Sequence, residues 1–145
     1  MTVLSDSTAS VIAAHLIAEG IFTDPDAVGS WPLSISHLPN NPDNAGAIYD
    51  TTGLKDGLLM EGTVIYKYGL QMLIRSFVYG DGRTKANAVA SEMESITDDS
   101  VVIGATTYTL QNISQVGSVL FLGIEQGSKR RNLFSINFLA TIGQT

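Results

Sequence analysis

The sequence predicts an α+β fold, with two helices packed on one face of a mostly antiparallel sheet. Two segments repeat apolar residues three and four positions apart, which is the period of a helix with one buried face. Several other segments are rich in β-branched and aromatic residues that alternate with polar ones, as in strands. The later strand-like segments follow one another directly, which favours antiparallel pairing. The 145 residues suit a single domain, residues 1–145.

The first helix is predicted from Thr8 to Glu19. Ser5, Asp6 and Ser7 precede it and are good N-cap residues. Gly20 follows it and is the natural C-terminal stop. The residues expected on one side of this helix are Val11, Ile12, Leu16 and Ile17.

A long irregular segment is expected between Ile21 and Gly46. It contains all four prolines together with many Asn and Asp residues. Alternation predicts a short extended piece from Trp31 to His37, and another is expected from Ala47 to Thr51.

The clearest strand is predicted from Thr63 to Tyr79, with apolar residues alternating along it. Gly80-Asp81-Gly82 is then expected to turn the chain, and Thr84 to cap a second helix that ends at Asp98-Asp99. The predicted buried stripe of that helix is Ala86, Val89, Ala90, Met93 and Ile96.

The rest of the chain reads as strands. They are predicted at Val101–Ile103, Thr107–Ile113, Val119–Glu125 and Leu133–Ile142. The last two should form a hairpin through Gly127-Ser128-Lys129-Arg130. One face of this hairpin would carry Leu120, Leu122 and Ile124, and another Phe134, Ile136, Phe138, Ala140 and Ile142.

Composition restricts the function classes. Eight basic and fourteen acidic residues give a net charge of −6, which disfavours binding that neutralises nucleic-acid phosphates. An acidic lumen would still let DNA slide through without sticking. The charged share of 15% is below the roughly 25% of typical soluble domains. This favours a subunit with extensive interfaces, although neutral polar residues could supply the same solubility.

No catalytic, cofactor or metal site is predicted, and the chain is not expected to be an enzyme. Cysteine is absent, which removes thiol nucleophiles and thiolate ligands. His15 and His37 are separated, and neither has an evident ligand partner at metal-site spacing. Asp24 and Asp26 begin like a calcium loop, but Ile35 stands where the closing Glu belongs. The glycines at 80–82 match neither a Walker loop nor a dinucleotide fingerprint.

Two segments are candidate protein interfaces because they are expected to be exposed. Lys129, Arg130 and Arg131 form a dense basic cluster at the predicted hairpin tip. This cluster is either a solvated turn or a docking point for an acidic face on a neighbouring subunit. The second segment is the loop from Pro39 to Gly46, with the candidate residues Asn40, Asp43 and Asn44.

The order of elements resembles the tail terminator and minor capsid family of long-tailed phages. The resemblance rests on the strand GLQMLIRSF at residues 69–77, which contains Gln71 and Arg75, followed by a turn, a helix with spaced alanines from Thr84 to Ile96, and C-terminal strands. It implies a hexameric ring that stops tail-tube growth and joins the tube protein to the head-completion or connector protein. DNA would pass through its lumen.

The same resemblance implies a virion protein of the tail or neck, made in the host cytoplasm. The N-terminus has no signal-peptide pattern, and no apolar run reaches the roughly 18 residues of a membrane span. Two alternatives stay open. One is a head-completion or stopper protein of the phage neck, and the other is a small ligand-binding or enzymatic α+β domain with a pocket between sheet and helices.

Overall fold

The computed structural model describes residues 4–27, 29–58, 64–127 and 129–144, with the backbone alone for 54–58, 64, 65 and 144. Two helices and six strands lie in these ranges. Their order is α1 (Thr8–Ala18), β1 (Leu33–Ile35), β2 (Ala45–Leu58), β3 (Val64–Ser76), α2 (Tyr79–Ser95), β4 (Asp99–Ile103), β5 (Thr106–Ile124) and β6 (Asn132–Gln144). The predicted strand start at Thr63 and the turn residue Ser128 lie outside the described residues.

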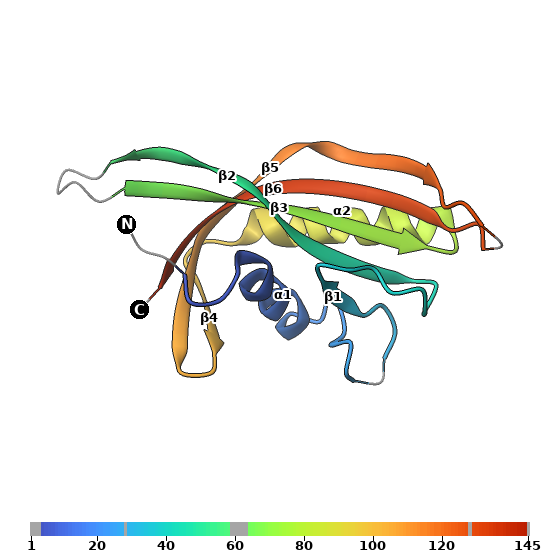
Figure 1. The fold of residues 1–145 in the computed structure, drawn as a ribbon, viewed down its shortest axis with the longest axis horizontal. Coiled ribbons are helices and arrows are strands. Elements are labelled where there is room, and N and C mark those ends of the chain that lie inside the picture. The colour runs from blue at the N-terminus through green and yellow to red at the C-terminus, as the bar shows by residue number, and fades with distance from the viewer. Residues whose placement is uncertain (1–3, 28, 59–63, 128, 145) are drawn as a thin grey trace.

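The strands form one curled sheet in the order β1-β2-β3-β6-β5-β4. The short β1 pairs parallel with β2, and every other pair is antiparallel. Figure 1 shows the sheet curving like a half-barrel over both helices. The α+β class and the mostly antiparallel sheet are therefore confirmed.

The core lies between the helices and the inward face of the two central strands. Antiparallel register sets Leu70 opposite Phe138, Met72 opposite Ile136 and Ile74 opposite Phe134, and these side chains are fully or almost fully buried. Because strand side chains alternate between faces, one run of alternate residues supplies this whole inward surface. The helix residues that are buried in the same cluster include Val11, Ile12, Leu16, Ala86, Val89 and Met93.

Helix α1 begins and ends close to its predicted limits. The Ser7 hydroxyl accepts a hydrogen bond from the Ser10 amide at 3.1 Å, which satisfies one of the free amides of the first turn. Gly20 follows the helix with a φ of +78°, a left-handed conformation that glycine adopts without strain.

Helix α2 begins at Tyr79, so the predicted turn at 80–82 and the predicted cap at Thr84 are wrong. Gly80 and Gly82 lie in the first helical turn, and Val78 is the N-cap residue without a side-chain cap bond. A Cβ at Gly82 would lie 2.5 Å from the Phe134 ring and 2.9 Å from the Ser76 Cβ. Glycine at 82 therefore serves close packing of helix on sheet and not a reversal of the chain.

Strand β5 is one long strand where the sequence predicted two. Its register against β6 shifts between Leu110 and Asn112, between Val116 and Leu120, and between Phe121 and Gly123. Gly117 and Gly123 have φ values of +77° and +114°. The segment 114–118, which separated the two predicted strands, is thus part of one strand with bulges, in which an extra residue bends the strand without ending it.

The extended piece predicted at 31–37 is shorter than expected. Only Leu33–Ile35 forms β1, because Trp31 and Ser36 both have positive φ, 64° and 65°, which a strand does not tolerate. In contrast, β2 extends well beyond the predicted Ala47–Thr51.

Candidate protein interface

The two predicted interface segments lie side by side at one end of the sheet. Arg131 Nη1 donates to the Asn40 carbonyl at 2.6 Å, and Nη2 donates to Asn40 Oδ1 at 2.9 Å. Lys129 Nζ lies 3.0 Å from Asn41 Oδ1 and 3.4 Å from Asp43 Oδ1. Residues about ninety positions apart in the chain therefore form one polar cluster.

The Arg131 side chain is buried and bonds the loop from Pro39 to Gly46, so it is not an exposed cation that could dock a partner. Only 3% of it is exposed. Its guanidinium donates to Glu125 Oε1, from Nε at 2.8 Å, and lies 3.3 Å from Asp43 Oδ1. A planar guanidinium offers five fixed donors and can therefore bond several loop acceptors at once. The expectation that this residue belongs to a solvated tip is wrong.

Arg75 of β3 is a second buried arginine in this cluster, which the sequence interpretation did not assign to it. It donates to the carbonyls of Pro42 at 2.6 Å and Asp43 at 3.1 Å. Glu125 Oε2 lies 3.9 Å from its Nη1. Burial, and then the positive charge of Arg131, lower the pKa of the Arg75 guanidinium, which starts so high that the group stays charged.

The loop is also tied to the junction of β3 and α2, because Asn44 Oδ1 accepts from the Phe77 amide at 2.9 Å. Asn40, Asp43, Asn44 and Arg131 thus make bonds within the chain. The polar side chains that remain outward at this end include Lys129, whose side chain is 43% exposed, and the exposed Arg130. The polar surface offered to a partner is therefore smaller than the sequence suggested.

A larger candidate surface lies beside this cluster, on the outer edge of β5. Strand β4 pairs only with Thr106–Leu110, and Asp98 bonds the Gln111 carbonyl. Within the described residues, no strand pairs with the outer edge of β5 from Asn112 to Ile124. Backbone donors and acceptors along such an edge are open to pairing with another chain.

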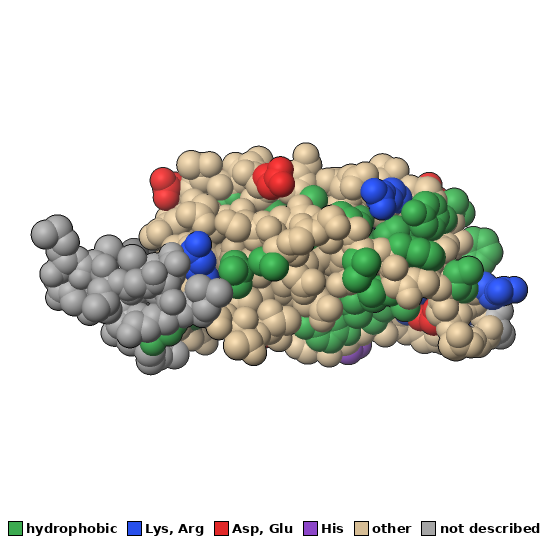
Figure 2. Space-filling model, turned by 90° about the horizontal axis from the view of Figure 1, so that it is seen from above, with side chains coloured by type: hydrophobic (Ala, Val, Ile, Leu, Met, Phe, Trp, Pro, Cys, Tyr) green, Lys and Arg blue, Asp and Glu red, His purple; other side chains and the backbone are tan. Residues whose placement is uncertain are grey.

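Large apolar side chains are exposed along this edge and at the adjacent start of α2. Tyr79 packs against Phe121 with ring centroids 5.1 Å apart, which joins the two elements. We call this surface the β5 edge patch, and it consists of Val116, Leu120, Phe121, Leu122, Ile124 and Tyr79, each 39 to 58% exposed. Figure 2 shows hydrophobic side chains gathered over the end of the molecule near the β5–β6 turn.

Of the features that protect edge strands, this edge has the bulges described above but neither charged residues nor prolines. Natural edge strands carry charged residues or prolines that prevent pairing with other chains. The nineteen residues of β5 include no Asp, Glu, Lys, Arg or Pro. The sequence interpretation placed Leu120, Leu122 and Ile124 on a common face. This is wrong, because the register shift between Phe121 and Gly123 sets Leu120 opposite Ser135 and Ile124 opposite Asn132, which point to opposite faces of β6.

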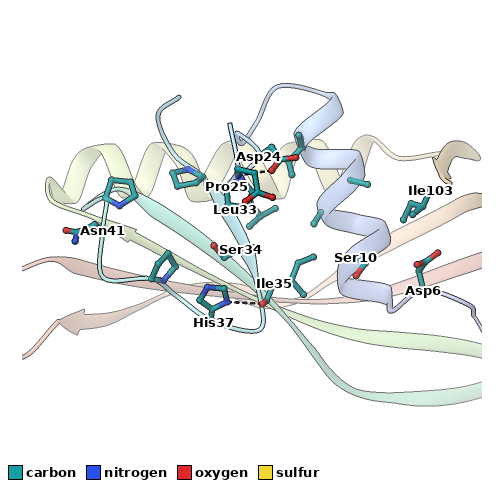
Figure 3. A pocket seen from close by; sticks show the side chains of 17 residues that line it. Asp6, Ser10, Asp24, Pro25, Leu33, Ser34, Ile35, His37, Asn41 and Ile103 are labelled. Atoms are coloured by element: carbon teal, nitrogen blue, oxygen red, sulfur yellow. Dashed lines mark hydrogen bonds between the residues drawn. The ribbon is translucent and has the colours of Figure 1, made fainter. Parts of the chain in front are cut away.

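A cavity of about 850 Å³ lies between α1, β1 and the loop that follows β1. Its labelled polar residues come from different sides, with Asp6 near the start of α1 and Asp24 and Asn41 on separate loops (Figure 3). His37 bonds back to the Ile35 carbonyl at 3.2 Å, and Ser10 bonds Ser7. These side chains do not converge on one point as a nucleophile and its base would.

A histidine and two glutamates form a possible ligand set elsewhere. The ligand atoms of His15, Glu19 and Glu92 all lie within 4.8 Å of one another. The expectation that His15 has no partner at ligand spacing is therefore wrong. Glu19 follows it by one helical turn, a detectable signal, whereas Glu92 comes from α2 and only the fold brings it near.

No protein-family model matches the chain, and no curated protein is significantly similar to it. No helix in the described residues is long and apolar enough to cross a membrane. The fold and this surface define a class: a small α+β domain in which no strand of the described residues covers the outer edge of β5 beyond Leu110.

Proposed function

We propose that this chain is a structural virion protein, a ring-forming tail terminator of a long-tailed phage. It would stop growth of the tail tube and join the tail to the head connector, with DNA passing through the ring. The observation that carries the association is the β5 edge patch. The order of elements, which resembles the tail terminator family, supports the particular role.

A second copy of the chain is the occupant that this patch suits best. A neighbouring strand would satisfy the open backbone groups of β5 and cover its apolar side chains, as in β-strand addition. In a ring, the surface of the second copy that pairs with β5 differs from the patch itself, because two paired β5 edges would close a dimer. An uncharged strand presents no like charges to that surface. Lys129 and Arg130, next to the patch, can contact the acidic surface of a neighbour whose net charge is −6.

The size of the patch indicates how association would proceed. Burying the exposed half of six large apolar side chains contributes roughly 6 kcal/mol, at about 1 kcal/mol each. Association of two chains costs an estimated 4–15 kcal/mol in lost freedom. Single contacts would therefore be weak. Closing a ring adds a further interface within one assembly at lower entropic cost, so rings would form at high concentration or on a tail tube.

One alternative is supported by a separate observation. The 850 Å³ cavity beside α1 is large enough for a small molecule, which would suit a ligand-binding domain. A head-completion or stopper protein of the phage neck would use the same β5 edge patch, but with different partners on the two faces of the ring.

The first test is solution mass by light scattering across protein concentration, with negative-stain imaging of large species. Wild type should form rings that Leu120→Lys with Leu122→Lys abolishes. Val102→Lys is the matched control, because Val102 is 66% exposed but lies on β4. Circular dichroism should show that all variants remain folded.

A polymerisation assay of the tail tube protein, with the ring added, then distinguishes a terminator from a stopper. A terminator ring should arrest tube polymerisation, whereas a stopper should not bind tube ends. Wild type that stays monomeric at every concentration and on tube ends would contradict the proposal. Saturable binding of a small molecule in the cavity would then favour the alternative.

A further inference from the structure

We propose that His15, Glu19 and Glu92 bind a divalent transition-metal ion of the zinc type, which joins α1 to α2. The three side chains come from the C-terminal turns of two helices that are far apart in sequence. This site is separate from the β5 edge patch and does not depend on the proposed assembly.

The ligand atoms are already close to a coordinating arrangement. His15 Nε2 and Glu92 Oε1 lie 2.9 Å apart, and all three ligand atoms lie within 4.8 Å. Zinc bonds of about 2.0–2.2 Å in a tetrahedral arrangement separate neighbouring ligand atoms by about 3.4 Å. A small opening of the first pair and a small inward movement of Glu19 would be sufficient.

The side chains combine one fixed ligand with two adjustable ones. His15 is 5% exposed, so packing holds its imidazole in place. The side chain of Glu92 is 21% exposed, and Glu19 is exposed. The exposed glutamate gives an ion access from solvent and leaves a position for water, as in zinc sites with three protein ligands.

Electrostatics favour a cation at this point. Helix C-termini carry partial negative charge, and basic residues usually occupy them. Here Glu19 is the C-cap residue of α1, and Glu92 lies in the last turn of α2. That last turn contains no basic residue. Two carboxylates and two helix ends therefore converge on one imidazole. A bound dication offsets the repulsion among these negative groups, which a single imidazole does not.

The donor set selects the kind of metal. Imidazole nitrogen suits zinc, copper, iron and nickel, whereas calcium and magnesium prefer all-oxygen sites. One histidine with two carboxylates therefore indicates a borderline transition metal.

The test is isothermal titration of the EDTA-treated, dialysed full chain with ZnCl2, together with Co²⁺ absorption spectra. We expect one Zn²⁺ per chain and a tetrahedral Co²⁺ spectrum. Glu19→Gln should raise the dissociation constant at least about tenfold, and because Glu19 is exposed this variant should stay folded. Glu94→Gln, an exposed glutamate in the same turn of α2, is the matched control and should bind as wild type does.

Thermal melting gives a second readout. Zn²⁺ should raise the melting temperature of wild type and of Glu94→Gln, and should raise that of Glu19→Gln much less. Absence of a stoichiometric Zn²⁺ site in wild type would overturn the proposal. Equal affinities of Glu19→Gln and wild type would also overturn it, because bound zinc would then lie at other surface carboxylates.

Discussion

Arg130 and Arg131 are adjacent in the chain but have opposite environments. Arg130 is exposed, whereas Arg131 is 3% exposed and bonded to Asn40 and Glu125. The contribution of a charged side chain to the free energy of unfolding depends on whether it is buried. Removing one member of a buried ion pair leaves its partners without compensation, whereas most surface changes are nearly neutral.

Arg131→Met should therefore lower the free energy of unfolding by about 3 kcal/mol, and Arg130→Met should change it by less than about 0.5 kcal/mol. Urea denaturation followed by circular dichroism measures both. Equal effects of the two substitutions would show that the buried bonds of Arg131 do not stabilise the fold. The same reasoning predicts that reversing the charges of Lys129 and Arg131 together destabilises the chain, so Arg130 is the better site for testing docking alone.

These residue environments could be anticipated only in part. A basic run near a turn indicates a hairpin tip, and Arg75 is a lone charge in an apolar strand. Which of these arginines is buried depends on the loop from Asn40 to Asp43, which reaches them only in the folded chain. Local sequence does not contain that contact.

At the scale of elements, the start of α2 shows how one glycine position can differ from another. Gly80 has nothing within 4 Å of an added Cβ, whereas Gly82 lies directly against the Phe134 ring. Both lie in the first turn of the helix. The intrinsic helical preference for alanine over glycine is therefore similar at the two positions, and only the packing differs.

Gly82→Ala should destabilise the protein by about 1–3 kcal/mol because it overpacks the contact between helix and sheet. Gly80→Ala should instead stabilise it, by up to about 1 kcal/mol. Thermal unfolding followed by circular dichroism gives both values. Stabilisation by both substitutions would mean that the helix is not held this close to β6.

The periodic elements were predictable, but their boundaries were not. The apolar period of α1, together with Ser7 and Gly20, placed that helix to within a residue. The glycines at 80 and 82 suggested a turn, because glycine is common in turns. In the structure, glycine allows the close approach of helix and sheet at position 82, and glycines at 117 and 123 lie at the bulges of β5.

At the scale of the whole molecule, two effects on self-association have opposite signs. The net charge of −6 disfavours it, and the uncharged β5 edge patch favours it. Like-charged subunits repel, and added salt screens that repulsion over a Debye length of about 10 Å at 0.1 M. Apolar contacts are not weakened by such screening. Charged contacts between Lys129 or Arg130 and an acidic neighbour would be weakened.

Raising NaCl from about 0.05 M to about 0.5 M should therefore strengthen self-association if the β5 edge patch carries it. Sedimentation velocity at fixed protein concentration measures the shift. Sodium sulfate should strengthen association further, since it favours burial of apolar surface. Association that weakens with salt would move the interface to the basic side chains.

The sequence by itself determined the class of this protein, its two helices and the strands of its core, because these follow from apolar periods within a few residues. Only the tertiary structure decided which apolar residues stay exposed, which arginines are buried, and that His15 meets Glu92. Each of these depends on the strand order and on contacts between distant segments. The alternation along β5 is compatible with either a covered or an open edge. Within the described residues the edge is open beyond Leu110 because the five-residue β4 pairs only with Thr106–Leu110.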